Sequence, residues 1–192
     1  MKTVDITPDA MARHIARFAK LKPIENDYAE REGVPPEALR MIAADRIYTI
    51  VSEGAAPGAA VGGGGISVYV LDCPPGDGPA IHAHVETHES FMCLRGRFRI
   101  RYGDHGRFET ILDENDFIAV PPGVMRQFEN VSETENATLL VIIAGQPEDA
   151  LRDVYYPPEV GAKLEERFGA DAKAGIERMG LQFTAEQGAS AD

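Results

Sequence analysis

Apolar and polar residues alternate in short runs through the middle of the chain, from about residue 47 to residue 145. The runs are rich in β-branched and aromatic residues, and clusters of Gly, Pro, Asn and Asp separate them. Short strands at regular spacing, with no helical stretch between them, predict an antiparallel sandwich or barrel. The runs that we interpret as strands are RIYTIVSE (46–53), GISVYVLDC (65–73), ESFMCL (89–94), RFRIRYG (97–103), FETIL (108–112), DFIAV (116–120), RQFENV (126–131) and ATLLVIIAG (137–145).

Helical spacing replaces this alternation on the N-terminal side. Thr7 can cap a helix that begins with Pro8, and apolar residues then recur at helical intervals. The segment VPPEALRMIAADR, residues 34–46, predicts a second helix that its two prolines begin. The recurring apolar residues of the first helix are Met11, Ile15, Phe18 and Leu21.

Helical spacing returns near the C-terminus. The segment PPEVGAKLEERFGADAKAGIERMG has Pro158 near its start and Gly180 near its end. We therefore divide the chain into a helical N-terminal extension (1–46), a β-barrel (47–145) and a helical C-terminal extension (146–192). The small, polar tail of the last part is expected to fray.

Charge and composition limit the possible partners. The chain of 192 residues has a net charge of -12, which disfavours nucleic acid and anionic membranes as partners because both are negatively charged. No apolar run has the about 18 residues of a membrane helix, and the first residues lack the apolar core of a secretory signal. Two cysteines are too few for a disulfide framework. We expect a cytoplasmic protein with no nucleic-acid or membrane partner.

Three of the five histidines lie in the segment GDGPAIHAHVETHESFMCLRG, residues 76–96. His82 and His84 share one face of an extended strand, because alternate residues point the same way. Glu89 opens the next strand, and a carboxylate on its inward face needs a partner or a cation. His88 has the opposite parity and is expected outside the site or behind its ligands. A metal site, a polar patch and a site that has lost its metal all remain open.

The spacing of this segment resembles the first sequence motif of the cupin superfamily. Gly76, five residues, His82-x-His84, four residues, Glu89, six residues and Gly96 match that motif at every fixed position. The resemblance implies an all-β core, namely an antiparallel jelly-roll β-barrel, here with helical N- and C-terminal extensions. It implies that the ligand site lies inside the barrel.

The second cupin motif is matched only in part by the segment NDFIAVPPGVMRQFEN, residues 115–130. Pro121, Gly123 and Asn130 match it. Asn115 replaces a glycine, which is a mild change because Asn tolerates left-handed turns. Arg126 replaces the histidine that is the fourth metal ligand in typical cupins, and arginine has no lone pair to offer a metal.

Three arrangements of Arg126 follow from this replacement. In the first, His82, His84 and Glu89 hold a metal, and Arg126 binds a substrate carboxylate or enolate through two parallel hydrogen bonds. In the second, Arg126 pairs with Glu89, and the barrel becomes a metal-free binding pocket. In the third, Arg126 points outward to surface acids such as Glu129.

We therefore predict a metal-binding cupin, dioxygenase-like, that acts on a small anionic or phenolic substrate. The predicted ligands of one divalent ion, Fe, Mn, Ni or Zn, are His82, His84 and Glu89, with His88 as a further candidate. Arg126 is the predicted catalytic residue. The alternative is a small-molecule binding module that contains an Arg126–Glu89 pair, and a purely structural metal is a third possibility. The resemblance also implies a homodimer.

Overall fold

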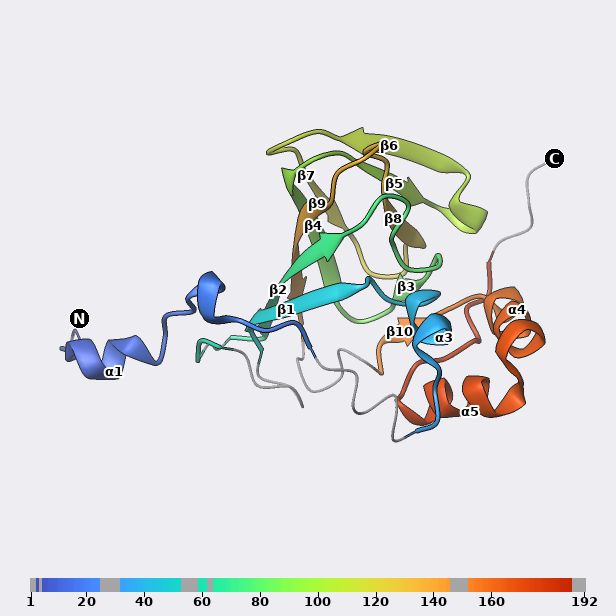
Figure 1. The fold of residues 1–192 in the computed structure, drawn as a ribbon, viewed down its shortest axis with the longest axis horizontal. Coiled ribbons are helices and arrows are strands. Elements are labelled where there is room, and N and C mark those ends of the chain that lie inside the picture. Colours follow the sequence, from blue (N-terminus) through green and yellow to red (C-terminus); the bar gives the residue numbers. More distant parts are fainter. Residues whose placement is uncertain are drawn as a thin grey trace.

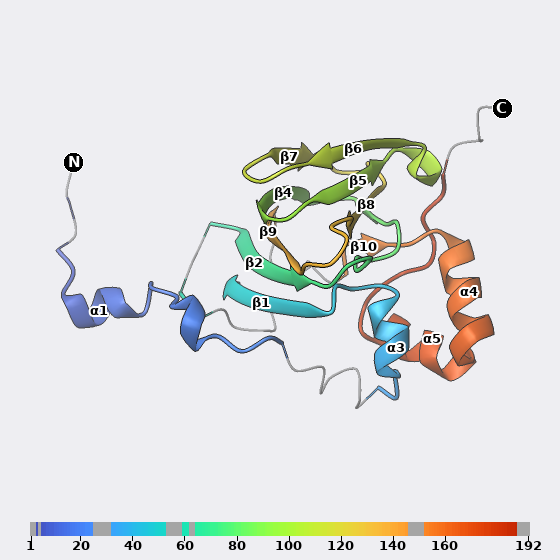
Figure 2. The ribbon, with the colours of Figure 1, turned by 45° about the horizontal axis from the view of Figure 1, so that its top comes forward.

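The computed structural model of the protein describes residues 3, 5–24, 32–52, 59–61, 64–145 and 152–187. Its strands form three antiparallel sheets, and Figures 1 and 2 show the two larger sheets on one side and the C-terminal helices on the other. The five-stranded sheet has the order β1 (Arg46–Val51), β2 (Ile66–Cys73), β9 (Ala137–Ala144), β4 (His88–Arg95), β7 (Phe117–Val120). The three-stranded sheet has the order β6 (Phe108–Leu112), β5 (Phe98–Tyr102), β8 (Arg126–Asn130), and the two-stranded sheet consists of β10 (Val154–Tyr155) and β3 (Ala83–His84).

The two larger sheets face each other across a common apolar core. Strands β4, β8 and β9 bury alternate residues, as the predicted period of two requires. The all-β core and the barrel are therefore confirmed. Side chains from both sheets meet in this core, which contains Leu71, Cys73, Phe91, Cys93, Phe98, Ile100, Leu112, Val120, Phe128, Ala137, Leu139 and Val141.

Two positions of the second motif have clear structural roles. Asn115 has a φ of 71°, so it adopts the left-handed conformation that its glycine-like place in the motif predicted. Asn130 is buried at the end of β8, and its Nδ2 donates to the carbonyl oxygens of Cys73 at 2.8 Å and Glu135 at 2.9 Å. Its Oδ1 accepts from the backbone N–H of Ser132 at 2.8 Å. Asn130 thus satisfies three backbone groups, one at the end of β2 and two in the loop between β8 and β9.

Helices and short 3-10 turns lie outside the two larger sheets or in the loops between their strands. They are α1 (Pro8–Ala12), η1 (Phe18–Lys20), α3 (Pro36–Arg40), η2 (Asp104–Gly106), α4 (Pro158–Phe168) and α5 (Ala170–Arg178). No helix of the described residues is long and apolar enough to cross a membrane.

The first N-terminal helix is shorter than the sequence predicted. Thr7 caps α1 as expected, but the helix ends at Ala12. The following turn makes hydrogen bonds to Val61 instead, through the backbone N–H of Val61 at 2.7 Å and its carbonyl oxygen at 2.8 Å. Phe18 packs its ring against Tyr48 of β1, with 5.1 Å between the ring centroids. These contacts across the chain override the helical spacing, because a short helix without tertiary packing is marginal in water.

The predicted C-terminal helical segment is divided into two helices. Gly169, with a φ of 90°, ends α4 and precedes α5. The two-residue strand β10, which pairs with β3, was not predicted within the C-terminal extension. Residues 188–192 of the tail that we expected to fray lie outside the described residues.

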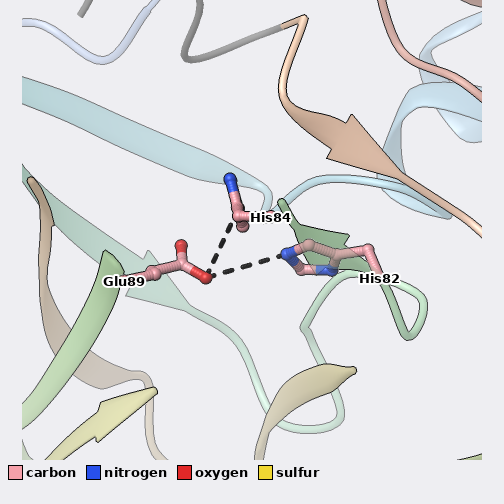
Figure 3. A group of neighbouring side chains, drawn as sticks. All are labelled: His82, His84 and Glu89. Carbon is pink, nitrogen blue, oxygen red and sulfur yellow. Dashed lines mark ion pairs between the residues drawn. The ribbon is translucent and has the colours of Figure 1, made fainter. Parts of the chain in front are cut away.

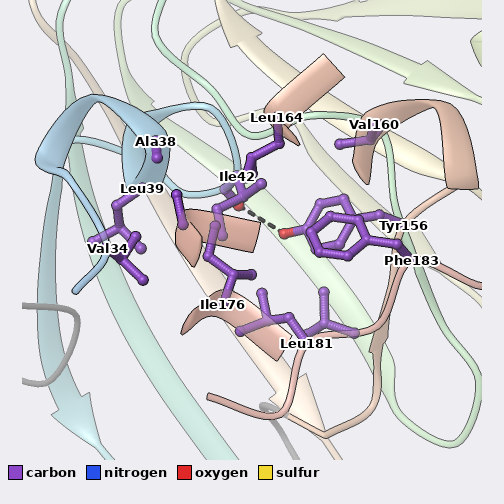
Figure 4. Packing of buried hydrophobic residues seen from close by; sticks show 12 residues of the cluster. Val34, Ala38, Leu39, Ile42, Tyr156, Val160, Leu164, Ile176, Leu181 and Phe183 are labelled. Atoms are coloured by element: carbon purple, nitrogen blue, oxygen red, sulfur yellow. Dashed lines mark hydrogen bonds between the residues drawn. The ribbon is translucent and has the colours of Figure 1, made fainter. Parts of the chain in front are cut away.

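The two extensions pack against each other in a second apolar cluster beside β3 and β10 (Figures 1 and 4). Tyr156 is a buried member of this cluster, and its hydroxyl donates to the carbonyl oxygen of Ile42 at 2.7 Å. Burial and the charge of Glu89 raise the pKa of Tyr156, which keeps the phenol neutral. The other buried members are Val34, Ala38, Leu39, Ile42, Val154, Val160, Leu164, Ala172, Ile176, Leu181 and Phe183.

Candidate metal centre

The structure brings His82, His84 and Glu89 together inside the barrel (Figure 3). All three side chains are buried, and one potential ligand atom of each lies within 4.8 Å of the others. The Oε2 atom of Glu89 is 3.5 Å from Nε2 of His84 and 3.8 Å from Nε2 of His82. His84 belongs to β3 and Glu89 to β4, so the site joins two sheets.

Hydrogen bonds at the far side of each ring fix which nitrogen faces Glu89. Nδ1 of His82 lies 2.9 Å from the carbonyl oxygen of Ala80, which can only accept, so Nδ1 carries the proton. Nδ1 of His84 lies 3.2 Å from the hydroxyl of Thr87, which itself donates to Asp153 at 2.7 Å. The hydroxyl of Thr87 therefore accepts from Nδ1 of His84. In the neutral form of each ring, Nε2 then presents a lone pair to the Glu89 carboxylate.

With both rings neutral, as metal ligands are, three hydrogen-bond acceptors converge with no proton between them. Glu89 Oε2 is buried and has no hydrogen-bond partner within the described part of the chain. A buried carboxylate in this state costs several kcal/mol unless a cation or donor satisfies it. Two ligand atoms that are each about 2.1 Å from one ion stand roughly 3 to 3.5 Å apart, close to the separations seen here. The donor set, two imidazoles and one carboxylate, fits a divalent transition metal.

The pKa values of the ligands agree with this chemistry. Burial raises the pKa of Glu89, but the neighbouring His82 and His84 and the charge of Arg126 lower it more, to about 2. Burial lowers the pKa of His84 to about 4, against the opposing attraction of Glu89. At neutral pH the carboxylate is ionised and the His84 imidazole is neutral, as metal ligands must be.

Arg126 lies beside the three candidate ligands and is fully buried. It begins β8 and forms an antiparallel bridge with His82, so both side chains project to the same side of the sheet. Its Nε is 3.6 Å from Glu89 Oε2, and Nη2 donates to the carbonyl oxygen of Pro121 at 3.4 Å. Nε and Nη1 have no hydrogen-bond partner among the described residues. Burial lowers the pKa of the guanidinium and Glu89 opposes this shift, but arginine remains protonated.

The outward arrangement of Arg126 is therefore wrong. Glu129, its proposed surface partner, accepts instead from Nη1 of Arg99 at 3.3 Å. The bridge to His82 explains the inward direction, since opposite residues of an antiparallel pair share a face. His88 is exposed on the other face of β4, as its parity predicted, and does not join the group.

Sequence reasoning missed Thr87 and Asp153, which contact the candidate ligand His84. Thr87 lies within the first motif, but its hydroxyl role depends on a carboxylate that is 66 residues away. Asp153 belongs to the C-terminal extension, and no spacing rule connects it to the histidines. The only available signal was an acidic residue next to a short apolar segment, which is too common to be informative.

Comparison with known proteins identifies a family domain within the barrel. The sequence model of the family described as "Cupin domain" matches residues 69–143. No curated protein matches the chain. Together with the jelly-roll arrangement of the sheets and the ligand set, these findings define a β-barrel protein of the cupin type. Residues 69–143 therefore form a cupin domain, which makes up the barrel of this chain.

Solved structures with a similar fold have low sequence identity to the chain. Peruvianin-I, a cysteine peptidase from Thevetia peruviana latex, is 17% identical over 74% of this chain and 77% of its own, with a TM-score of 0.51. An oxalate oxidase structure is 18% identical over 60% and 62%, with a TM-score of 0.42. A sugar phosphate isomerase from Silicibacter pomeroyi is 26% identical over 43% and 52%, with a TM-score of 0.38. The chain spans between 31% and 65% of the first four structures, and the likeness to Peruvianin-I supports the fold alone.

The buried neutral His84 predicts an acid-sensitive metal-free protein. Its pKa falls from about 6.5 in the unfolded chain to about 4 in the folded one. Between these values only the unfolded chain takes up the proton, so stability is full above pH 6.5 and falls as the pH drops. Urea unfolding of metal-free protein should show a loss on the order of 1–2 kcal/mol from pH 7 to pH 5.

The variant His84→Gln should lose much of this pH dependence. His88→Gln is the matched control, because His88 is exposed on the same strand that carries Glu89. Equal slopes between pH 5 and pH 7 for the wild type and both variants would contradict the assignment to His84.

Proposed function

We propose that the protein is a metal-dependent cupin that binds a small anionic or phenolic substrate at one divalent ion. The observation that carries the proposal is the convergence of three buried acceptors, His82 Nε2, His84 Nε2 and Glu89 Oε2, without a donor. A cation at this point would satisfy all three. Fe, Mn, Ni and Zn all suit this ligand set.

We propose an oxidoreductase of the dioxygenase kind by analogy with cupins that carry the same first motif. When bound, a metal with three protein ligands keeps open positions and supplies a Lewis acid for substrate, or a place where O2 and substrate meet. Arg126 would orient the substrate, because its free Nε and Nη1 donors lie next to the ligands and suit a carboxylate or enolate oxygen. The buried surroundings exclude water and strengthen these charge contacts.

The alternative is a metal-free binding module that uses an Arg126–Glu89 pair. The contact of 3.6 Å between Arg126 Nε and Glu89 Oε2 favours it. A dedicated guanidinium–carboxylate pair, however, forms hydrogen bonds of about 2.7–2.9 Å. Here neither atom has a hydrogen-bond partner, and His84 is as close to the carboxylate as Arg126 is. The geometry therefore favours a shared cation over a closed pair.

Metal content tests the proposal directly. Protein stripped with chelator and incubated with Fe(II), Mn(II), Ni(II) or Zn(II) should retain about one ion per chain, measured by mass spectrometry of metals after desalting. His82→Ala and Glu89→Gln should each abolish retention, because a site with two ligands binds weakly. His88→Ala should retain the ion. A wild type that retains none of the four ions supports the binding module instead.

Arg126 is expected to act on the substrate rather than on the metal. Arg126→Gln should keep or strengthen metal retention, since it removes a repelling charge. It should weaken binding of small carboxylates by about 10- to 100-fold, the contribution of hydrogen bonds to a charged group. Calorimetric titration of the metal-loaded protein with acetate, oxalate and benzoate measures this, and Arg126→Lys should be intermediate. Equal affinity of wild type and Arg126→Gln for all three anions would show that Arg126 does not bind the substrate.

We also propose that the chain forms a homodimer through its N-terminal arm, residues 5–24. Figures 1 and 2 show that α1 lies away from the barrel, whereas the rest of the arm runs beside β1. The exposed apolar residues of the arm are Ile6, Met11, Ile15 and Phe18. Residues 1–24 contain five basic and two acidic residues, whereas the whole chain carries -12, so the remainder carries -15. A basic, partly apolar arm suits the acidic barrel of a second copy.

Oligomeric state tests the role of the arm. Sedimentation velocity should show a dimer for the wild type and a monomer for Met11→Glu/Ile15→Glu, because the new carboxylates would face an acidic partner. Phe117→Glu, at an exposed apolar position on β7, is the comparison and should remain dimeric. A monomeric wild type, or a dimer that only Phe117→Glu dissociates, would place the arm outside any interface.

A further inference from the structure

A buried carboxylate of the C-terminal extension lies directly behind the candidate metal ligands. Asp153 is 3% exposed and accepts hydrogen bonds from three consecutive backbone N–H groups, those of Val85 at 2.8 Å, Glu86 at 2.9 Å and Thr87 at 2.9 Å. It also accepts from the Thr87 hydroxyl at 2.7 Å. One side chain therefore holds the loop that joins the strand of His84 to the strand of Glu89.

The direction of the hydrogen bonds along this chain is fixed. Four donors surround the Asp153 carboxylate, and such hydrogen bonds favour its charged form, which can only accept. The Thr87 hydroxyl must donate its only proton to this carboxylate. Its oxygen is then available to accept from Nδ1 of His84, 3.2 Å away. The carboxylate itself is 3.8 Å from that same nitrogen.

We infer that Thr87 and Asp153 are positioning residues that hold His84 in the tautomer a metal requires. This inference rests on the proposed function and deepens it. With Nδ1 protonated, Nε2 of His84 offers its lone pair to the site. In the other tautomer Nε2 would carry the proton and would donate it to Glu89 Oε2, 3.5 Å away. That internal hydrogen bond would occupy both ligands and exclude the cation.

The position of Asp153 depends on the second apolar cluster. Val154 and Tyr156, which follow it, are buried in that cluster, and Val154 pairs with His84 in the short sheet of β3 and β10. The ring of Tyr156 also lies 5.5 Å from the ring of His82. The packing of the C-terminal extension therefore sets the positions of Asp153 and of the strand that pairs with His84. The extension is in this sense part of the site.

The tautomer of His84 and the metal affinity test the inference together. Thr87→Val keeps the shape of the side chain and removes the hydroxyl, and Thr87→Ser keeps the hydroxyl. Thr87→Val should weaken Zn(II) binding, measured by competition with a chromophoric chelator, by about 10- to 100-fold, as for other partners behind metal ligands. Thr87→Ser should restore the wild-type affinity. Thr49→Val is the matched control, because the buried Thr49 hydroxyl on β1 has no hydrogen-bond partner among the described residues.

Long-range ¹⁵N–¹H NMR of metal-free protein supplies a readout that a merely structural role would not change. The wild type should show His84 protonated at Nδ1, and Thr87→Val should show an increased share of the Nε2-protonated ring. A wild type already protonated at Nε2 overturns the inference, even if Thr87→Val does not fold. So does a folded Thr87→Val with unchanged tautomer and unchanged Zn(II) affinity. A wild type with the expected tautomer that binds no metal contradicts the proposed function alone.

Discussion

The site is organised around the buried carboxylate oxygen of Glu89, which faces two imidazole nitrogens and the Arg126 guanidinium but forms no hydrogen bond among the described residues. The carboxylate oxygen and the two Nε2 atoms cannot donate a proton to one another while both rings are neutral and protonated at Nδ1. Such an arrangement is unstable in a dry interior unless something positive lies between the atoms. The surrounding hydrogen bonds hold the rings in this arrangement. They keep the three atoms in an arrangement that a bound cation would stabilise, which is the physical basis of the proposed metal site.

Two separate cores hold that arrangement in place. The barrel core fixes Glu89 through β4, which pairs with β9 on one side and β7 on the other. The second cluster fixes the histidine side through Tyr156 and the short sheet of β3 and β10. The ligand atoms meet where these two cores adjoin. The barrel positions Glu89 and, through the bridge to Arg126, also His82, whereas the two-residue strand β3 that carries His84 pairs with β10 of the extension.

The sequence was most informative where one local rule decides the structure. The period of two placed Glu89 inward and His88 outward, and β6 has the bounds that its apolar run predicted. The glycine-like position of Asn115 likewise implied its positive φ. Helical spacing failed near Phe18, because Tyr48 and Val61 supply contacts that no local pattern contains. Asp153 was beyond prediction for the same reason, since its partners lie 66 to 68 residues away.

Arg126 gives this site a different charge balance from that of a typical cupin. A neutral histidine at this position leaves a divalent ion and one carboxylate, with a net charge of about +1. With Arg126 the same group carries about +2. All four residues are at most 5% exposed: His82, His84, Glu89 and Arg126. A buried charge of that size demands anionic partners. Under the proposed function, the replacement of histidine by Arg126 therefore removes one metal-coordinating side chain. In exchange, the site favours a substrate with one or two negative charges.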